Sequence, residues 1–489
     1  MMRSLFSGVS GLKNHQTRMD VIGNNISNVN TTGYKSSRVN FTDMLSQTLS
    51  GASTPQDNVG GTNPKQIGLG SAVGAIDLLF TNGSVQSTGV NTDLALSSTN
   101  ALFILDLSGT GNNLKYTRNG DFQFDAKGNY VQAGTGYYVQ GWTADAKSGS
   151  INTQDKVGKI TIESGKQMAP AATTQATYTN NLNAEVPTIT EMTYTFKDGT
   201  SATITTGSLP HPIDPATTQA DVPVSATVKL SDGSTLTLTS GMYTIGNSMP
   251  VVTTLNVYDT LGSEHELTLY FTLKDASKDT WVVSLSTDSS TAGETTTHKW
   301  TEKDGTKTEA SMKNIELIFD ENGAFKKGDG NSTLTLTNGS ASPQTIQLKL
   351  DGLTQYSSSS TIAGNTDGNA AGTLSSISID KSGVITGTYT NGLKRTEAQV
   401  ALQRFNNPGG LTKIGESLYE DSNNAGKSGS PSTAADLGAT ITPAALEMSN
   451  VDVANEFTDM IITQRGFQGN SKIITVSDEM LETLINMKR

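Results

Sequence analysis

The sequence predicts a mainly β, multidomain chain whose two ends are α-helices, and three observations predict this fold class. Glycine accounts for 49 of 489 residues and hydrophobic residues for only 34%, a composition that suits turn-rich β-structure. Eleven Asn-Gly or Asp-Gly pairs, a strong hairpin signal, all lie between residues 82 and 392. Proline is absent before Pro55 and after Pro443, where apolar residues recur at helical spacing.

The first predicted element is an amphipathic helix at the N-terminus. We expect it to end within Gly23-Asn24-Asn25 or just beyond Val29, because the residues that follow favour local side-chain bonds or left-handed backbone. Its apolar stripe, at three-four spacing, consists of Leu5, Val9, Leu12, Met19, Ile22, Ile26 and Val29.

The middle of the chain is predicted to be built of hairpins. The clearest case runs from Val251 to Leu285, where three runs of alternating apolar residues are separated by turn-like segments. This pattern predicts a three-stranded meander with one buried face. Two polar, glycine-rich stretches, residues 51–74 and 422–438, are predicted to be linkers or extended arms.

The last predicted element is a second amphipathic helix, which we expect to start near Ser449-Asn450, where capping residues precede the periodic run. Its apolar residues follow a seven-residue rhythm typical of coiled coils. They are Phe457, Met460, Phe467, Ile474, Leu481 and Leu484.

The two helical stripes predict self-association. The apolar area that they offer is small beside the entropic cost of ordering both helices, so we expect loose ends that order against copies of the same chain. Isolated helices are only marginally stable in water, so we expect the ends to be loose even when all their backbone hydrogen bonds are formed. The alternative is that the two helices close an antiparallel pair on their own domain, and the pattern alone leaves both possibilities open.

Composition and charge exclude several partners. The net charge is −12 and no Lys/Arg cluster offers a surface for phosphates, so neither nucleic acid nor an anionic membrane is an expected partner. No window approaches the roughly 18 apolar residues of a membrane span, so no membrane insertion is expected. The chain contains no cysteine, which excludes disulfides and thiolate chemistry.

No constellation of residues points to catalysis, so we expect no enzyme activity and no catalytic, cofactor-binding or metal site. The four histidines are dispersed and share no metal-ligand spacing. The glycines at 68–74 precede a predicted strand, whereas a dinucleotide loop needs a helix there. The acidic turn at Asp320–Gly323 lacks the ligand alternation of an EF-hand.

Two motifs carry a family resemblance. The residues Asn24, Asn25, Asn28, Thr32, Gly33, Tyr34 and Lys35 resemble the N-terminal signature of flagellar rod and hook proteins. The stretch from Leu446 to Val453, continuing to Asn486, is similar to the matching C-terminus of these axial proteins. The resemblance implies a subunit contact for Tyr34 and Lys35. Gly23 and Gly466 depart from the family pattern, since glycine weakens a helix.

A large β-insertion makes the chain resemble the hook proteins more than the shorter rod proteins. The resemblance implies the following organisation: a terminal helical polymerisation domain (1–30 and 446–489), linkers or extended arms (31–74 and 422–445), an inner β-domain (75–145 and 346–421), and outer β-domains (146–345) with an extra inserted module (183–250).

The resemblance implies a structural subunit that self-assembles into a flexible hollow helical tube, which couples rod to filament and transmits torque. The implied partners are other copies of the chain, the flagellar rod, the hook cap, the hook-filament junction proteins and the flagellar type III export apparatus. The implied location is extracellular, in the flagellar hook at the cell surface, after export without a cleaved signal peptide. The alternatives are a distal rod protein and a β-rich surface adhesin.

Overall fold

The computed structural model describes residues 2–487 except 56, 58, 59, 110, 112, 146–148, 210, 276–279, 288–292, 302–304, 306, 329–332 and 338–342. The predicted turns at Asp304, Asp329 and Asn338, and residue 146 where the outer domains are expected to begin, lie outside the described residues. The chain forms two compact units, Met1–Lys166 with Leu374–Arg489, and Gln167–Thr373. They are described in turn as the first and the second unit.

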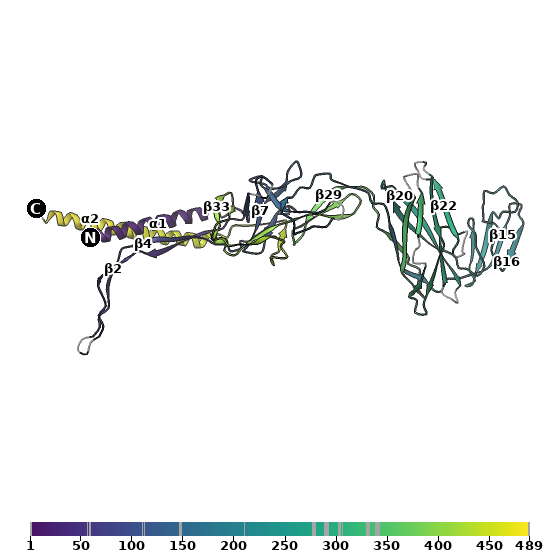
Figure 1. Ribbon diagram of the computed structural model, residues 1–489, viewed down its shortest axis with the longest axis horizontal. Coiled ribbons are helices and arrows are strands. Elements are labelled where there is room, and N and C mark those ends of the chain that lie inside the picture. Colours follow the sequence, from purple (N-terminus) through teal and green to yellow (C-terminus); the bar gives the residue numbers. More distant parts are fainter. Residues whose placement is uncertain are drawn as a thin grey trace. The chain divides into compact units, whose positions relative to one another are not determined.

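The two terminal helices of the first unit lie side by side and antiparallel (Figure 1). Helix α1 (Met2–Ser27) continues through Gly23-Asn24-Asn25 and ends between the two predicted points. Helix α2 (Val453–Asn486) begins three residues later than expected, because Asp452 is its N-cap and accepts hydrogen bonds from the backbone N–H groups of Ala454 and Asn455. The helices at both ends confirm the predicted fold class.

The β-part of the first unit is a large, mostly antiparallel sheet that contains the consecutive order β29-β30-β31-β11-β7-β8-β34-β33, with short two-stranded pairs beside it. Its strands are β1 (Ser37–Asp43), β2 (Ser46–Ser50), β3 (Lys65–Gly68), β4 (Ser71–Leu78), β5 (Val85–Ser87), β6 (Leu94–Leu96), β7 (Ala101–Asp106), β8 (Leu114–Thr117), β9 (Phe122–Phe124), β10 (Tyr130–Gln132), β11 (Tyr138–Thr143), β12 (Gly158–Lys159), β29 (Gly372–Ile379), β30 (Val384–Tyr389), β31 (Lys394–Val400), β32 (Leu402–Phe405), β33 (Thr412–Gly415), β34 (Leu418–Glu420), β35 (Lys427–Ser432), β36 (Ile441–Pro443) and β37 (Ala445–Glu447), with a 3-10 turn at Pro408–Gly410.

The segments expected to be arms are structured. Residues 31–74 contain the paired strands β1 and β4 and the hairpin of β2 and β3. Residues 422–445 contain β35 and β36 and bury Ala434, Ala439 and Ile441 in the same apolar core as Phe103 and Val400. Few and scattered apolar residues in a polar, glycine-rich stretch look like a linker in sequence, but the structure buries these three in a common core.

The second unit is a sandwich of a five-stranded and a six-stranded sheet with one shared apolar core, in which Trp281 and Phe271 are fully buried. A four-stranded sheet of order β16-β15-β17-β18 has an apolar cluster of its own. The strands are β13 (Gln167–Met168), β14 (Gln175–Asn183), β15 (Ile189–Thr195), β16 (Ser201–Ile204), β17 (Ser225–Leu230), β18 (Thr235–Leu238), β19 (Val251–Tyr258), β20 (Glu264–Asp275), β21 (Thr280–Ser284), β22 (Thr295–Thr301), β23 (Lys307–Lys313), β24 (Ile315–Phe319), β25 (Phe325–Lys327), β26 (Thr333–Thr337), β27 (Gln344–Tyr356) and β28 (Ala363–Thr366).

The predicted meander is confirmed, since β19 pairs with β20 and β20 with β21, all antiparallel. Some of the predicted turns are confirmed and one is wrong. Pairs beginning at Asp198, Asp232, Asn322 and Asn391 connect hairpins, each with its glycine at positive φ. Asp351-Gly352 instead lies inside β27 opposite Thr179, where the register shifts, so the turn prediction there is wrong.

Candidate functional site

The seam between α1 and α2 is lined by small and polar residues. A Cβ at Gly11 would lie 2.6 Å from the Asn470 side chain, and one at Gly8 would lie 3.3 Å from Ile474. Further along, the Ser4 and Ser477 hydroxyls lie 3.4 Å apart. Small residues let the two helix backbones approach closely, and at Gly8 the space is taken by the Ile474 side chain.

His15 explains the glycine in the middle of α2. A Cβ at Gly466 would lie 2.6 Å from the His15 ring, so the imidazole occupies the space that a larger residue would need. The other side of the ring meets Phe41 edge-on, with centroids 5.9 Å apart. Burial, and secondarily the charge of Arg18, lowers the pKa of His15, which favours the neutral ring.

The apolar stripes predicted from sequence are only partly covered by the chain itself. Of the thirteen residues, Ile22 alone is buried; Leu5, Leu12, Met19, Ile26, Val29, Met460, Ile474 and Leu481 are half-buried; Val9, Phe457, Phe467 and Leu484 are exposed. The same helices carry further exposed apolar residues that were not predicted: Phe6, Ile461, Ile462, Ile473, Val476, Met480 and Ile485. A search for apolar residues outside the seven-residue rhythm would have found them.

Polar contacts hold the base of the helix pair. Arg18 and Asp459 form an ion pair of 3.0 Å across the seam. Asn25 is buried and donates from Nδ2 to Glu456 Oε1 at 2.8 Å. The Asn25 amide also bonds the backbone of Ser37 in both directions, accepting from its N–H and donating to its carbonyl oxygen. One side chain therefore ties together α1, α2 and the start of β1.

The family motif forms the turn that follows α1. Asn28 donates to the Asn24 backbone carbonyl, and the Tyr34 hydroxyl donates to Asn24 Oδ1 at 2.7 Å. Thr32 Oγ1 donates to Asn119 Oδ1 at 3.0 Å. These bonds connect the helix end to the large sheet, and burial, with a smaller contribution from the charge of Glu456, raises the pKa of Tyr34.

Gly33 stands at the closest approach between this turn and the sheet. Its φ is +66°, and a Cβ there would lie 2.5 Å from the Asn119 backbone nitrogen. Its own N–H donates to the Glu447 carbonyl at 2.7 Å. A side chain at this position meets both a strained backbone conformation and a backbone clash, so the position requires glycine.

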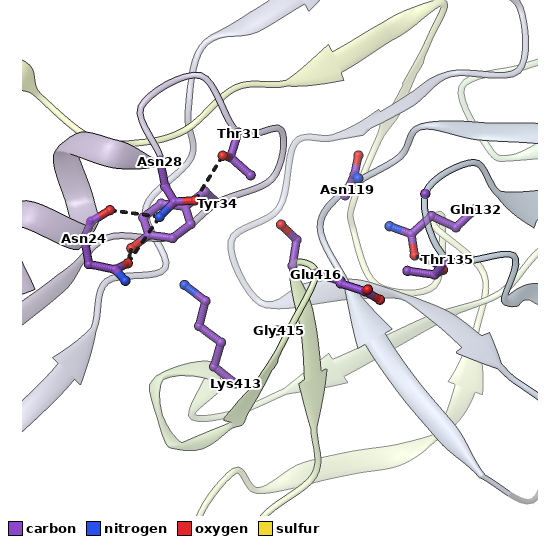
Figure 2. A pocket seen from close by; sticks show the side chains of 12 residues that line it. Asn24, Asn28, Thr31, Tyr34, Asn119, Gln132, Thr135, Lys413, Gly415 and Glu416 are labelled. Atoms are coloured by element: carbon purple, nitrogen blue, oxygen red, sulfur yellow. Dashed lines mark hydrogen bonds between the residues drawn. The ribbon is translucent and has the colours of Figure 1, made fainter.

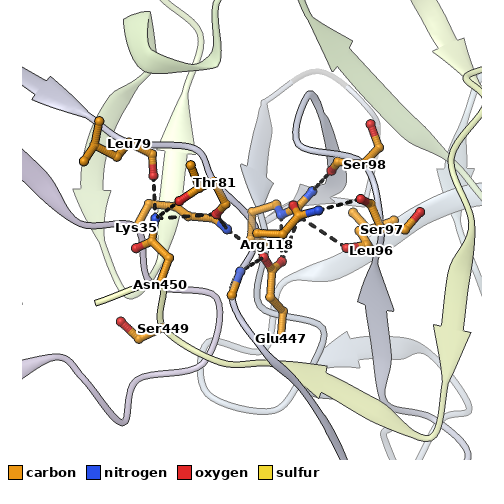
Figure 3. Close-up of polar contacts among 12 residues, drawn as sticks. Lys35, Leu79, Thr81, Leu96, Ser97, Ser98, Arg118, Glu447, Ser449 and Asn450 are labelled. Carbon is orange, nitrogen blue, oxygen red and sulfur yellow. Dashed lines mark hydrogen bonds and ion pairs between the residues drawn. The ribbon is translucent and has the colours of Figure 1, made fainter. Parts of the chain in front are cut away.

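Lys35, the last residue of the motif, forms a buried ionic cluster with Arg118 and Glu447 (Figure 3). Lys35 Nζ lies 2.7 Å from Glu447 Oε1, and the Arg118 guanidinium lies 2.9 Å from Glu447 Oε2. No side chain of the three is more than 1% exposed. Arg118 also donates to the carbonyl oxygens of Ser98 and Ala101, and Lys35 donates to that of Thr81.

One carboxylate serves two cations in this cluster, and the pKa shifts reflect that. Burial opposes ionisation of Glu447, but the charges of Arg118 and Lys35 and their hydrogen bonds outweigh it, so the pKa of Glu447 is lowered. The pKa of Lys35 is also lowered, because burial and the neighbouring Arg118 outweigh the attraction of Glu447. The cluster joins three segments that are far apart in the sequence.

The expected subunit contact for Tyr34 and Lys35 is wrong, because both side chains are buried within one chain. Arg118 was not predicted from the sequence, Glu447 was predicted only as part of a motif, and Asn450 only as part of that motif and as a helix cap. Asn450 accepts from the Ser36 N–H and donates to the Leu79 carbonyl. One feature of the sequence could have predicted these contacts, namely the presence of both terminal motifs. Polar residues of the two motifs meet at the ionic cluster.

The described residues include no group of three or more His, Asp or Glu side chains that could hold a metal ion. Across the same residues, neither helix is both long and apolar enough to cross a membrane.

Four family models match this chain. They are described as flagella basal body rod protein (residues 5–35), flagellar hook protein FlgE/F/G D1 domain (103–179), flagellar basal body protein FlaE D2 domain (244–369) and flagellar basal body rod FlgEFG protein C-terminal (442–487). The first and last matches contain the two terminal motifs. Residues 180–243, which include β15 to β18, fall between the D1 and D2 matches.

Curated relatives extend over the whole chain. The flagellar hook protein FlgE of Treponema pallidum is 34% identical over 527 aligned residues, and that of Borreliella burgdorferi is 38% identical over 514, each covering 100% of both chains. The flagellar basal-body rod protein FlgG of Bacillus subtilis is 48% identical over 174 residues, which are 34% of this chain and 64% of that protein. The similarity to a rod protein is thus higher locally but covers a third of the chain.

Proposed function

This chain belongs to the flagellar hook protein family, and we propose that its terminal helices are the module through which its copies polymerise. Within that family the chain is a structural subunit of the flagellar hook. The observation that carries the proposal is the pair of helices whose seam is small and polar while large apolar side chains face outward. Phe457 and Ile461, on α2, are 50% and 58% exposed.

Exposed apolar residues in this number are unusual for a folded chain and are typical of an interface. They lie along the length of α2, from Phe457 to Ile485, so the contact extends over the whole helix. A tube of identical subunits needs heterologous contacts, in which two different surfaces of the chain meet and the contact does not close into a ring. The predicted stripe residues other than the buried Ile22, together with the seven further exposed ones, supply such surfaces.

The base of the helix pair supports the proposed transmission of torque. Asn25 connects both helices to the start of β1, and the ionic cluster connects Lys35, just before β1, to Arg118 at the end of β8 in the large sheet. Buried polar networks of this kind rigidify their surroundings. A rigid base lets motion of the helices carry the sheet with it. We therefore assign to the family motif a structural role inside the subunit, and to the helix faces the role of subunit contact.

The proposed partners follow from the same assignment. They are other copies of the chain, the rod, the hook cap, the hook-filament junction proteins and the flagellar type III export apparatus. The proposed location is the extracellular hook, and no catalytic role is proposed. A distal rod protein is the weaker candidate, because the rod relative matches about a third of the chain whereas the hook relatives match all of it.

Electron microscopy of the purified chain at high concentration tests the proposal. We expect tubes from the intact chain and none from a chain lacking residues 1–30. The double variant Phe457→Ser with Ile461→Ser should raise the critical concentration for assembly. Leu236→Ser is the matched control, because Leu236 is similarly exposed but lies on β18. Termini that resist proteases in a dilute monomer, together with an absence of tubes, would count against the proposal.

A further inference from the structure

A polar cavity of about 410 Å³ lies where the end of α1 meets the large sheet. Figure 2 shows its lining, which comes from the end of α1 and the following turn, from the segment after β10, and from the hairpin of β33 and β34. The function proposed above uses the motif residues of this cavity and leaves its other lining residues without a role. These include Gln132, Thr135, Lys413 and Glu416.

Lys413 is the cation of this cavity. Its Nζ lies 3.8 Å from the centroid of the Tyr34 ring, a cation–π contact, and it has no carboxylate partner among the residues that the structure describes. Partial burial lowers the pKa of Lys413. An ammonium group held over an aromatic ring without an anion is a point of attachment for an incoming carboxylate.

Three amide side chains present further donors to the same cavity. Gln132 is 1% exposed, and its Oε1 accepts from Thr135, so the Nε2 group is left without an acceptor in the described part of the chain. Asn24 Oδ1 accepts from Tyr34, and Asn119 Oδ1 accepts from Thr32. Gln132 Nε2 is therefore a buried donor in the cavity lining, and buried donors demand partners. Asn24 and Asn119, which are exposed and half-buried, contribute their amide groups to the same lining.

The hairpin tip that forms the rim is held in one conformation. Glu416 and Ser417 have φ values of 52° and 59°, a left-handed backbone that is uncommon for residues other than glycine. Figure 2 shows the Glu416 carboxylate on the side of Thr135, away from the Lys413 ammonium. The arrangement leaves Lys413 and the three amides to receive an anion, with Glu416 as an acceptor at the edge.

The end of α2 carries carboxylates that match this cavity. Asp478, Glu479 and Glu482 are exposed and make no ion pair with any described residue. Ser477 faces Ser4 near the start of α1, so the acidic end of α2 extends past its partner helix, as Figure 1 shows. The same stretch carries the exposed apolar residues Leu484 and Ile485.

These carboxylates cannot reach the cavity of their own chain. Glu456 lies at the cavity end of the helix pair, beside Asn25, and Asp478 follows 22 residues later on the same helix. At 1.5 Å per residue these two points are about 33 Å apart. The acidic end and the cavity therefore lie at opposite ends of one straight element, so a contact between them joins two chains.

We propose that the cavity at Lys413 receives the acidic end of α2, residues 478–482, from a second copy of this chain. The contact is heterologous and runs head to tail, the kind that extends a polymer instead of closing a dimer. It rests on the proposed function in assigning the partner as another hook subunit. It adds a specific, charged contact to the apolar contacts already proposed, and charged contacts select register and orientation.

Binding of a peptide with the sequence of residues 453–487 to the full-length chain, measured by fluorescence anisotropy below the critical concentration, tests this proposal. We expect saturable binding that weakens as salt is added. Lys413→Glu should weaken it about tenfold or more, since like charges then face each other. Lys394→Glu, at an exposed lysine of β31 outside the cavity, is the control and should bind as the parent does.

A charge swap identifies the partner residues. A peptide in which Asp478, Glu479 and Glu482 are all changed to Lys should fail on the parent chain and bind to Lys413→Glu. The inference would be overturned if the original peptide did not bind, or if Lys413→Glu left its affinity unchanged. Circular dichroism of each variant verifies folding, and Lys413→Gln, which removes the charge without reversing it, should give an intermediate affinity.

An assembly assay separates this inference from the proposed function. If the parent chain forms tubes and Lys413→Glu forms them at the same critical concentration, the contact proposed here is wrong while helix-driven assembly stands. If the parent forms no tubes, helix-driven assembly fails, and the peptide measurement still decides for or against the Lys413 contact.

Discussion

The sandwich of the second unit and the terminal helices of the first treat large apolar residues in opposite ways. In the sandwich, Trp281 and Phe271 are completely buried between two sheets of the same chain. On α2, Phe457 and Ile461 are at least half exposed. The sandwich therefore obtains its stability from its own core, whereas the helices keep their apolar surface for another molecule. The difference separates a region that folds by itself from one that is completed by assembly.

The base of the helix pair differs from both of these regions, because buried polar groups stabilise it. The ionic cluster and Asn25 bring the two ends of the chain together at the sheet. Apolar residues would pack there equally well in any of several registers. Charges and amides with defined partners specify a single register, and this is the best-attested use of buried polar groups.

The largest effect is expected in the sandwich. Trp281→Ala removes a completely buried indole and should lower the free energy of unfolding of the second unit by about 3–5 kcal/mol. Urea unfolding monitored by hydrogen exchange measures the free energy of unfolding of each unit separately. Phe457→Ala is the matched control on the helices, and its effect on the monomer should stay within about 0.5 kcal/mol. Equal losses from both substitutions would contradict the comparison.

A substitution in the ionic cluster should lower stability nearly as much as Trp281→Ala does. Glu447→Gln leaves Lys35 and Arg118 buried without a counter-charge, and removal of one partner of a buried pair costs about 3–5 kcal/mol. Thermal unfolding of the first unit measures the loss. Glu420→Gln breaks an ion pair with Lys115 in which the carboxylate is half exposed, and it should cost less than about 1 kcal/mol.

Acid should weaken the same cluster. The folded pKa of Glu447 is lowered from its ordinary value of 4.5, so its contribution is fully present above that value and is lost as the pH falls through the folded pKa. Stability of the first unit should therefore fall on acidification below about pH 4.5. In Glu447→Gln this part of the pH dependence disappears, and unfolding curves recorded from about pH 7 to about pH 2 on both chains measure the difference. An unchanged slope in the variant would contradict the assignment.

A smaller loss is expected where the motif turn meets the sheet. Gly33→Ala combines positive φ with a clash against the Asn119 backbone, and we expect a loss of about 1–3 kcal/mol. Gly23→Ala provides the contrast, because a methyl group at this position would meet no atom within 4 Å and alanine favours a helix by about 1 kcal/mol. Chemical unfolding of the two variants should move in opposite directions.

The smallest effect on the monomer is expected on the exposed helix face. Ile461→Ser touches no buried contact and should change monomer stability by less than about 0.5 kcal/mol. It should nevertheless raise the critical concentration for assembly by about tenfold or more, since each exposed aliphatic side chain buried at an interface contributes about 1.5–3 kcal/mol. Sedimentation of polymer from monomer measures this value. A variant that lowers both monomer stability and assembly would show that the face is already covered.

Patterns of local residues predicted the elements well where one interaction dominates. The strands from Val251 to Leu285 were predictable because alternation with a buried face has few other solutions. Asp351-Gly352 was predicted wrongly because a neighbouring strand, β14, holds it extended through Thr179. The start of α2 shifted to Val453 because the Asn450 side chain bonds the backbone of Leu79 and cannot serve as the cap.

The sequence by itself determined the fold class, the two terminal helices, the family and the absence of any cysteine chemistry, because periodicity, turn pairs and motifs are local or are read directly from the residues. Only the tertiary structure decided that Lys35 meets Glu447 and Arg118, that Tyr34 is buried within the chain, and that Gly466 makes room for His15. Those contacts join residues hundreds of positions apart. Their pairing depends on how the backbone returns through two units, which no local pattern encodes.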